Sequence, residues 1–202
     1  LPLNGVKIGD EISLKIFAHL VQPIDSFFHA FGSHLSDQFD EFEKVRFYFN
    51  LNPIYAEQFF ALLSTTLNRY CVPYHFKALI DPRLYTRADS AVLYSAKRHF
   101  YFVAKLLLEI SRTLPVAFKD GVPMFCKTLC PGIAVAEDVS DEESFGLHRC
   151  RLVSEGIVGA WLKGQEDVDS RMKNVEAVFS ANGLSLDQVH LKAGSAEFFL
   201  PE

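Results

Sequence analysis

The chain has 202 residues, of which 49% are hydrophobic, and it carries a formal net charge of -5. A chain of this length and composition can bury one sizeable core, so we expect a single domain over residues 1–202. The acidic balance excludes general nucleic-acid binding, because that requires a basic surface that releases counterions from phosphates. A transmembrane helix is excluded as well, since the sequence has no run of about 18 apolar residues.

The first part of the chain, residues 1–44, is predicted to be a helical segment that ends in a loop. Between Ile12 and Phe31, apolar residues recur at near-helical spacing, which indicates one or two short helices. Residues 33–44 are polar and acidic, as expected of a surface loop. The start at Leu1 lacks the charged and apolar regions of a signal peptide.

Periodic patterns predict the elements of the remaining chain. Val45 to Leu51 alternates as a strand does, with Arg46 and Tyr48 on the face opposite the apolar one. Further strands are predicted at 74–80, 90–94, 124–129 and 133–137, and helices at about 53–70, 98–112, 144–162 and 168–182. Strands and helices neither alternate strictly nor repeat. This order favours an α+β class, in which a small antiparallel or mixed sheet packs against helices and the core spans 45–191.

The cysteines Cys71, Cys126, Cys130 and Cys150 are too few and too scattered for a disulfide scaffold, so we expect reduced thiols in the cytosol. Cys126, Cys130 and Cys150 together with His148 have the ligand types of a zinc site. Their spacing matches no known finger or ribbon. Buried apolar cysteines are therefore the preferred reading, and we predict neither a metal nor a cofactor.

The stretch from Pro73 to Ser95 places His75, Lys77, Arg83 and Arg87 between two apolar runs. Alternate side chains of a strand share a face, so the imidazole of His75 and the ammonium of Lys77 stand side by side. Arginine's planar fork matches a phosphate or carboxylate, which makes this stretch a candidate anion site. The alternative is that this face is the solvated side of a half-covered sheet.

A second candidate anion site is the start of the helix predicted at 144–162. Ser144 is a good N-cap, and a helix N-terminus offers unpaired N–H groups and a partial positive charge. His148, Arg149 and Arg151 follow within two turns. The alternative is that the arginines are solvated or paired with nearby glutamates, as surface arginines commonly are. The sequence has no P-loop, GxSxG, HExxH or GxGxxG motif, so nucleotide hydrolysis and zinc proteolysis are unsupported.

Several ordered motifs resemble those of one protein family. They are Phe76-Lys77, Asp81-Pro82, Tyr85-x-Arg87-x-Asp89-Ser90-Ala91-Val92-Leu93-Tyr94, Pro131-Gly132-Ile133-Ala134-Val135-Ala136-Glu137-Asp138, Glu143-Ser144-Phe145-Gly146-x-His148-Arg149-Cys150 and Glu155-Gly156. This pattern resembles the HopA family of type III effector-like proteins over roughly 45–191. The family includes plant-pathogen effectors and bacterial proteins that work beside a small kinase in making lanthipeptides and thioamide-containing peptides.

In those pathways the resemblance implies a lyase that removes phosphate from phosphoserine or phosphothreonine of a peptide and leaves a dehydroamino acid. Lys77 is the candidate base, because such chemistry needs a base at the α-proton and cations around the departing phosphate. The candidate catalytic residues are Lys77, His75, His148 and Tyr94, and the candidate phosphate ligands are Arg83, Arg87, Arg149, Arg151 and Ser144.

The expected partners are a phosphorylated peptide or protein substrate and a small kinase, with neither nucleic acid nor membrane. The alternative function is a non-catalytic, effector-like binding module that recognises an anionic, phosphorylated partner. We expect a cytoplasmic protein, and secretion as an effector is the alternative. An intact fold of this family does not by itself establish elimination.

Overall fold

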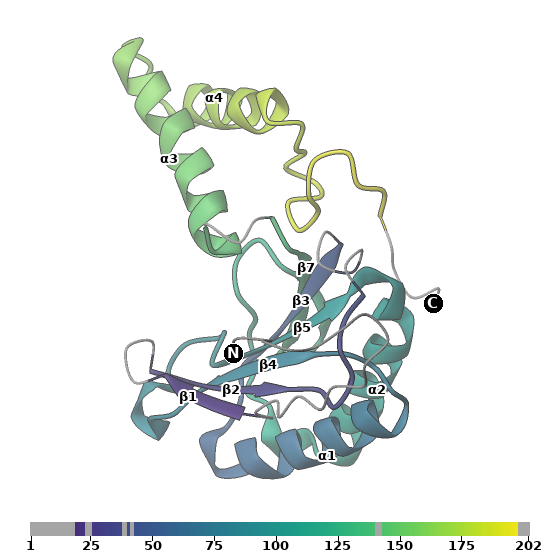
Figure 1. Ribbon diagram of the computed structural model, residues 1–202. Coiled ribbons are helices and arrows are strands. Elements are labelled where there is room, and N and C mark those ends of the chain that lie inside the picture. The colour runs from purple at the N-terminus through teal and green to yellow at the C-terminus, as the bar shows by residue number, and fades with distance from the viewer. Residues whose placement is uncertain (1–18, 23–25, 38–39, 41–42, 140–142, 198–202) are drawn as a thin grey trace, which may run out of the picture.

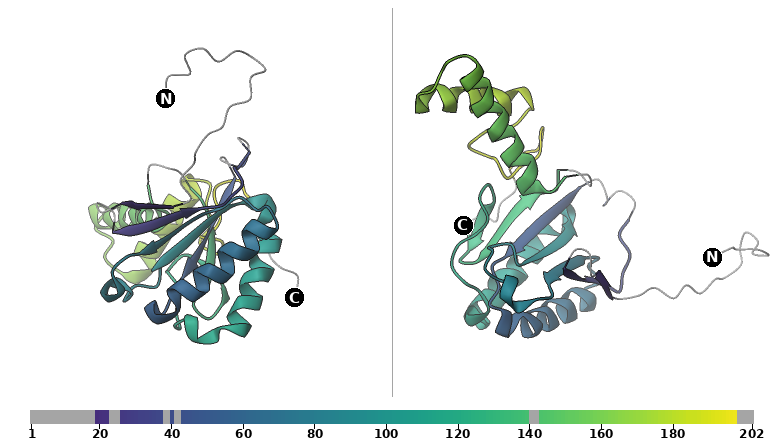
Figure 2. Two further views of the ribbon diagram at one scale, coloured as in Figure 1. Left: turned by 60° about the horizontal axis from the view of Figure 1, so that its bottom comes forward. Right: turned by 90° about the vertical axis from the view of Figure 1, so that its left-hand side faces the viewer.

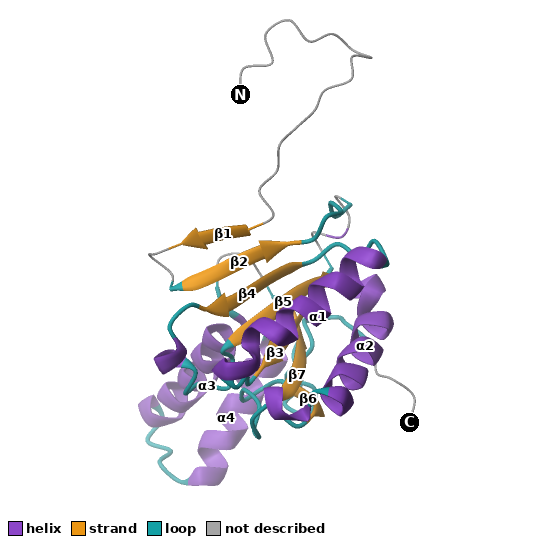
Figure 3. Cartoon of the chain, turned by 90° about the horizontal axis from the view of Figure 1, so that it is seen from below, coloured by secondary structure: helices purple, strands orange, loops and turns teal. Residues whose placement is uncertain are grey.

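The computed structural model describes residues 19–22, 26–37, 40, 43–139 and 143–197. In these residues, one antiparallel sheet has the strand order β1-β2-β4-β5-β3-β7-β6 (Figure 3). The strands are β1 (His19–Gln22), β2 (Phe27–Phe31), β3 (Lys44–Phe49), β4 (His75–Leu79), β5 (Ala91–Ala96), β6 (Lys127–Cys130) and β7 (Ile133–Glu137). The predicted α+β class is confirmed, and the sheet is antiparallel.

Two pairs of helices accompany the sheet. Helices α1 (Ala56–Arg69) and α2 (Phe100–Thr113) cover one of its faces (Figure 3). Helices α3 (Phe145–Leu162) and α4 (Val168–Ala181) pack on each other and extend away from the sheet (Figures 1 and 2). No helix among the described residues is long and apolar enough to cross a membrane.

The face of the sheet beneath α1 and α2 carries the main core. Phe76 of β4 lies opposite Leu93 of β5, which lies opposite Phe47 of β3, so large apolar side chains line up across the strands. They pack with the buried face of each helix, for example Phe59 of α1 and Leu107 of α2. Truncating a phenylalanine in such a core costs about 3–5 kcal/mol.

The opposite face of the sheet is polar and aromatic, because alternate residues of a strand point to opposite sides. Two cross-strand rows run over it. The first row is Phe31, His75, Tyr94 and Arg46, and the second is His29, Lys77, Val92 and Tyr48. The side-by-side placement of His75 and Lys77 expected from the sequence is confirmed.

The predicted helices between Ile12 and Phe31 are wrong where the structure describes this region. Residues 19–22 and 27–31 form β1 and β2, and β2 pairs with β4 along its whole length. Near-helical spacing of apolar residues was the misleading signal, since pairing with a neighbouring strand overrides local pattern. Most residues that carried that spacing, 12–17, lie outside the described part of the chain.

The junction of α3 and α4 depends on a glycine. A Cβ built at Gly156 would lie 2.5 Å from the Cα of Val175, which is closer than packed atoms can approach. The backbones of the two helices therefore meet at this point, and only glycine allows it. The N-caps fix both starts, because the side chains of Ser144 and Asp167 accept hydrogen bonds from Leu147 and Ser170 backbone N–H groups.

Candidate functional site

A hollow of about 390 Å³ opens on the polar face of the sheet, where the strands meet the start of α3. Its lining carries three cationic side chains, Arg46, Lys77 and Arg87, against one carboxylate, Asp89. We call this hollow the cationic pocket. Its remaining lining residues are Phe27, Tyr48, Val92, Tyr94, Pro123, Met124, Cys126, Ser144, Phe145, Gly146 and Leu147. The two candidate anion sites of the sequence, 73–95 and the start of α3, thus converge here.

Lys77 lines this pocket from β4. Its Nζ atom is 5.1 Å from the ring centroid of Phe27 and 5.4 Å from that of Tyr94, so aromatic faces surround the amino group. No carboxylate among the described residues forms an ion pair with it. The amino group is therefore available to an incoming molecule.

Arg87 reaches the pocket from the loop between β4 and β5. Its Nε and Nη2 atoms donate to the two carboxylate oxygens of Asp89 at 2.5 and 2.6 Å. This pairing holds the pKa of Arg87 above its usual value and orients the planar guanidinium. The side chain remains 55% exposed, so its other N–H groups still face solvent.

Arg46 was not among the candidate site residues from sequence. The alternation of 45–51 had nevertheless placed it correctly on the polar face of β3. It is buried, forms an ion pair with Asp138, and stacks with its Cζ atom 5.2 Å from the Tyr94 ring centroid. Tyr48, also buried, lies two residues further along β3, and burial raises its pKa. The alternation of 45–51 was the signal that could have added both residues to the site.

The N-terminus of α3 closes one side of the cationic pocket. The first turn of the helix lines the pocket with Phe145, Gly146 and Leu147. Backbone N–H groups in the first turn of a helix have no intrahelical acceptor. Ser144 lines it as well, but its hydroxyl accepts the N–H of Leu147 at 3.3 Å and so serves as the cap. The partial positive charge of the helix start adds to that of the three cations.

Arg149 does not line this pocket. It is fully buried and donates from Nε to the carbonyl of Val189 at 2.8 Å and from Nη2 to that of Leu191 at 2.6 Å. Burial lowers its pKa to about 10. Its Nη1 lies 2.8 Å from Nδ1 of His148. Arg149 was predicted to be a phosphate ligand, but its hydrogen bonds instead hold the segment after α4 against α3.

Three other predicted site residues also lie outside the pocket lining. Arg83 is 89% exposed and pairs with Asp81, at the surface of the same loop that carries Arg87. Arg151 pairs with glutamates at 143 and 155, as the solvated alternative described. His148 lies beside Arg149, and burial followed by the charge of Arg149 lowers its pKa. The structure therefore brings together Lys77, Tyr94, Arg87 and Ser144, and leaves these three, Arg149 and His75 outside the cationic pocket.

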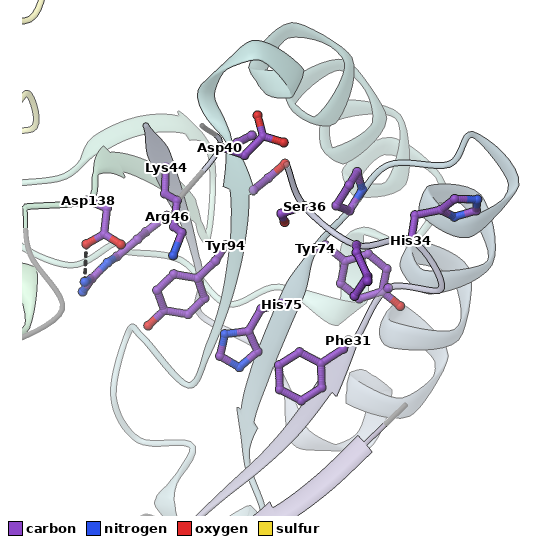
Figure 4. A pocket seen from close by; sticks show the side chains of 15 residues that line it. Phe31, His34, Ser36, Asp40, Lys44, Arg46, Tyr74, His75, Tyr94 and Asp138 are labelled. Carbon is purple, nitrogen blue, oxygen red and sulfur yellow. Dashed lines mark hydrogen bonds and ion pairs between the residues drawn. The ribbon is translucent and has the colours of Figure 1, made fainter. Parts of the chain in front are cut away.

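A second hollow, of about 630 Å³, adjoins the first and shares Arg46 and Tyr94 with it. Its floor is a row of stacked rings: His75 lies 4.7 Å from Phe31 and 5.0 Å from Tyr94 between centroids (Figure 4). We call it the ring pocket. His75 lies here rather than in the cationic pocket, and burial, then the neighbouring His29, lower its pKa to about 4.

Comparison with known proteins identifies the family of this chain. The sequence profile of the HopA1 effector protein family matches residues 22–191. The chain belongs to this family. The match begins at Gln22, the last residue of β1, and therefore includes the whole of β2, a strand in a region where helices were predicted.

Two solved structures share the fold. The effector protein from Pseudomonas syringae pv. tomato strain DC3000 is 21% identical with a TM-score of 0.63, and the match covers 85% of this chain and 65% of that one. For the effector protein from Pseudomonas syringae pv. syringae strain 61 the values are 19%, 0.63, 83% and 63%. The chain thus spans less than two thirds of either effector. No curated protein sequence matches it.

The cysteines of this HopA1 family member do not gather. Cys71 and Cys150 are exposed, which contradicts their reading as buried apolar residues, while Cys126 and Cys130 are partly buried. Burial raises the pKa of Cys126 to about 12, so the one thiol in the cationic pocket stays protonated. Within the described residues, no cluster of three or more His, Cys, Asp or Glu side chains has the arrangement of a metal site.

Proposed function

We propose that this protein is a lyase that eliminates phosphate from phosphoserine or phosphothreonine in a peptide or protein. The observation that carries the proposal is the cationic pocket, in which Lys77 lies without a carboxylate partner beside Arg46, Arg87 and the start of α3. Elimination needs a base and a cationic phosphate site that are close enough to contact the same phosphorylated residue. The pocket supplies both.

Lys77 is the base by comparison with the other polar groups of the pocket. Arginine does not deprotonate in proteins, which removes Arg46 and Arg87. The raised pKa values of Tyr48 and Cys126 keep both protonated. Asp89 is engaged by Arg87 through both oxygens. Among the nitrogen, sulfur and carboxylate groups of the pocket, the lysine amine is the one without a competing partner in the described residues.

The proposed step balances without a cofactor. The Nζ lone pair of Lys77 takes the α-proton of the phosphorylated residue, and the C–H electron pair becomes the Cα=Cβ double bond. The Cβ–O bond breaks, and its electrons leave with the phosphate oxygen. The products are a dehydroamino acid and inorganic phosphate, and Lys77 later loses its proton to water. Arg87, Arg46 and the N–H groups of α3 stabilise the charge on the departing phosphate, with Tyr94 as a hydroxyl donor.

The test is turnover of phosphoserine and phosphothreonine peptides by the protein and by its Lys77→Ala variant. We expect the variant to lose at least about 100-fold in kcat, the usual contribution of a positioned base, while binding the peptide with little change. Lys105→Ala, an exposed lysine on α2 behind the opposite face of the sheet, is the matched control and should keep full turnover.

The competing candidate is a binding module that holds a phosphorylated protein in the same pocket, in line with a family of effector proteins. The same variants separate the two functions. A binding module shows no turnover, and Lys77→Ala then weakens binding of the phosphopeptide. A catalyst loses turnover and retains its affinity.

A further inference from the structure

We propose that the ring pocket binds a large uncharged side chain, aromatic or aliphatic, two residues away from the phosphorylated residue of an extended peptide. The inference rests on the proposed function, which seats the phosphorylated residue in the cationic pocket. It adds a sequence preference to that function. The ring pocket is defined by its lining of Phe31, Leu35, Tyr74, His75 and Tyr94 with neighbouring residues (Figure 4).

The spacing of the two pockets matches an extended peptide. Lys77 and His75 are two residues apart on β4 and point to the same face. A strand rises about 3.3 Å per residue, so the two side chains are separated by about 6.6 Å. In an extended peptide, side chains two positions apart also share a face at this separation. A phosphorylated residue over Lys77 therefore directs its second neighbour over His75, and Tyr94 and Arg46 form the boundary between them.

The ring pocket offers flat apolar surface. The rings of Phe31, His75 and Tyr94 are nearly parallel, with interplanar angles of 11° and 14°. Phe31 remains 38% exposed and Leu35 76% exposed, so apolar area is open to a visiting side chain. Stacked and offset rings are a favourable surface for a further aromatic group. A hollow of about 630 Å³ is ample for one such side chain.

Asp40, Arg46 and Asp138, which line the ring pocket beside Lys44, take part in ion pairs. Arg46 pairs with Asp138, and Asp40 receives the guanidinium of Arg98 at 2.8 Å. The Nε2 atom of His75 shares a hydrogen bond of 2.8 Å with Nδ1 of His29, and its low pKa keeps the imidazole neutral at physiological pH. Unlike the ring pocket, the cationic pocket holds Lys77, which has no carboxylate partner among the described residues. An uncharged side chain fits the first and a phosphate the second.

The test compares phosphoserine peptides that carry Phe, Ala or Glu two residues before, or two residues after, the phosphoserine. We expect Phe at one of these two positions to raise kcat/KM about ten-fold over Ala, the value of roughly 1.4 kcal/mol from a partly buried ring. Glu should give no gain. Equal values for Phe and Ala at both positions would overturn the proposal.

Variants assign the preference to the ring pocket. In Phe31→Ala, the Phe-to-Ala ratio of kcat/KM should fall to about two or less, while Phe102→Ala, a phenylalanine on α2 with nearly equal exposure of 36%, should keep it. Leu35→Glu places a charge on the same wall without removing any buried group, and should also lower the ratio. A ratio that survives in both Phe31→Ala and Leu35→Glu contradicts the assignment.

A parallel binding measurement separates this proposal from the proposed function. The dissociation constants of the same peptides, labelled with a fluorophore, are measured with Lys77→Ala, whose turnover is slow, and with Lys77→Ala combined with Phe31→Ala. A preference for Phe that disappears in the double variant supports the ring pocket even if the wild-type protein eliminates nothing. Turnover without any Phe preference supports the lyase and refutes the ring pocket.

Discussion

At the scale of single residues, Arg149 and Arg151 show how two positions on opposite sides of one helix take different roles. Both follow Ser144 and both were candidate phosphate ligands. Arg149 faces inward and satisfies two backbone carbonyls, whereas Arg151 faces solvent and pairs with glutamates. Sequence identifies an arginine but does not say which side of α3 it occupies relative to a distant segment such as 189–191. Apolar residues are spread around α3 rather than gathered on one face, so the sequence did not predict which side of the helix is buried.

Arg149→Met should lower the free energy of unfolding by about 2–4 kcal/mol, because the carbonyls of Val189 and Leu191 lose buried charged donors. Arg151→Ala should leave the urea midpoint unchanged within error, since Arg151 itself and its partner Glu155 are exposed. Urea unfolding followed by circular dichroism measures both. Equal midpoints for the two variants would show that the buried contacts of Arg149 contribute no net stability.

At the scale of elements, most strands and helices after residue 44 could be predicted because local pattern and packing agree there. The β3 alternation and the Ser144 cap are examples, and both are found in the structure. The segment before β3 could not, because β2 is specified by its pairing with β4, a partner more than 40 residues away. The same limit applies to the site: the meeting of β4 with the start of α3 is a tertiary contact that no local signal announces.

The α3–α4 arm offers a matched pair of glycines for a test at this scale. Gly156→Ala should destabilise the protein by about 1–3 kcal/mol, because the new methyl group meets the backbone of Val175. Gly159→Ala has open space around its Cβ position and should stabilise α3 by about 0.5–1 kcal/mol through helix propensity. Thermal unfolding of both variants checks the expectation, and a stable Gly156→Ala protein would contradict the close helix contact.

At the scale of the whole molecule, the charge distribution favours a specific anion over anions in general. The chain has a net charge of -5, yet the cationic pocket holds three cations against one carboxylate. A local positive region in an acidic protein attracts a phosphate at that point while repelling polyanions elsewhere. The two pockets lie side by side on one sheet face, with helices covering the other, and we propose that an extended phosphopeptide binds across both.

The most direct test of the elimination account is the intact mass of a phosphoserine peptide after incubation with the unmodified protein. The account predicts loss of phosphoric acid, which leaves dehydroalanine and one water less than the free serine peptide. A product with the mass of the unphosphorylated serine peptide would mean hydrolysis, and an unchanged mass across phosphoserine and phosphothreonine peptides would mean binding alone. Either result would contradict elimination at Lys77.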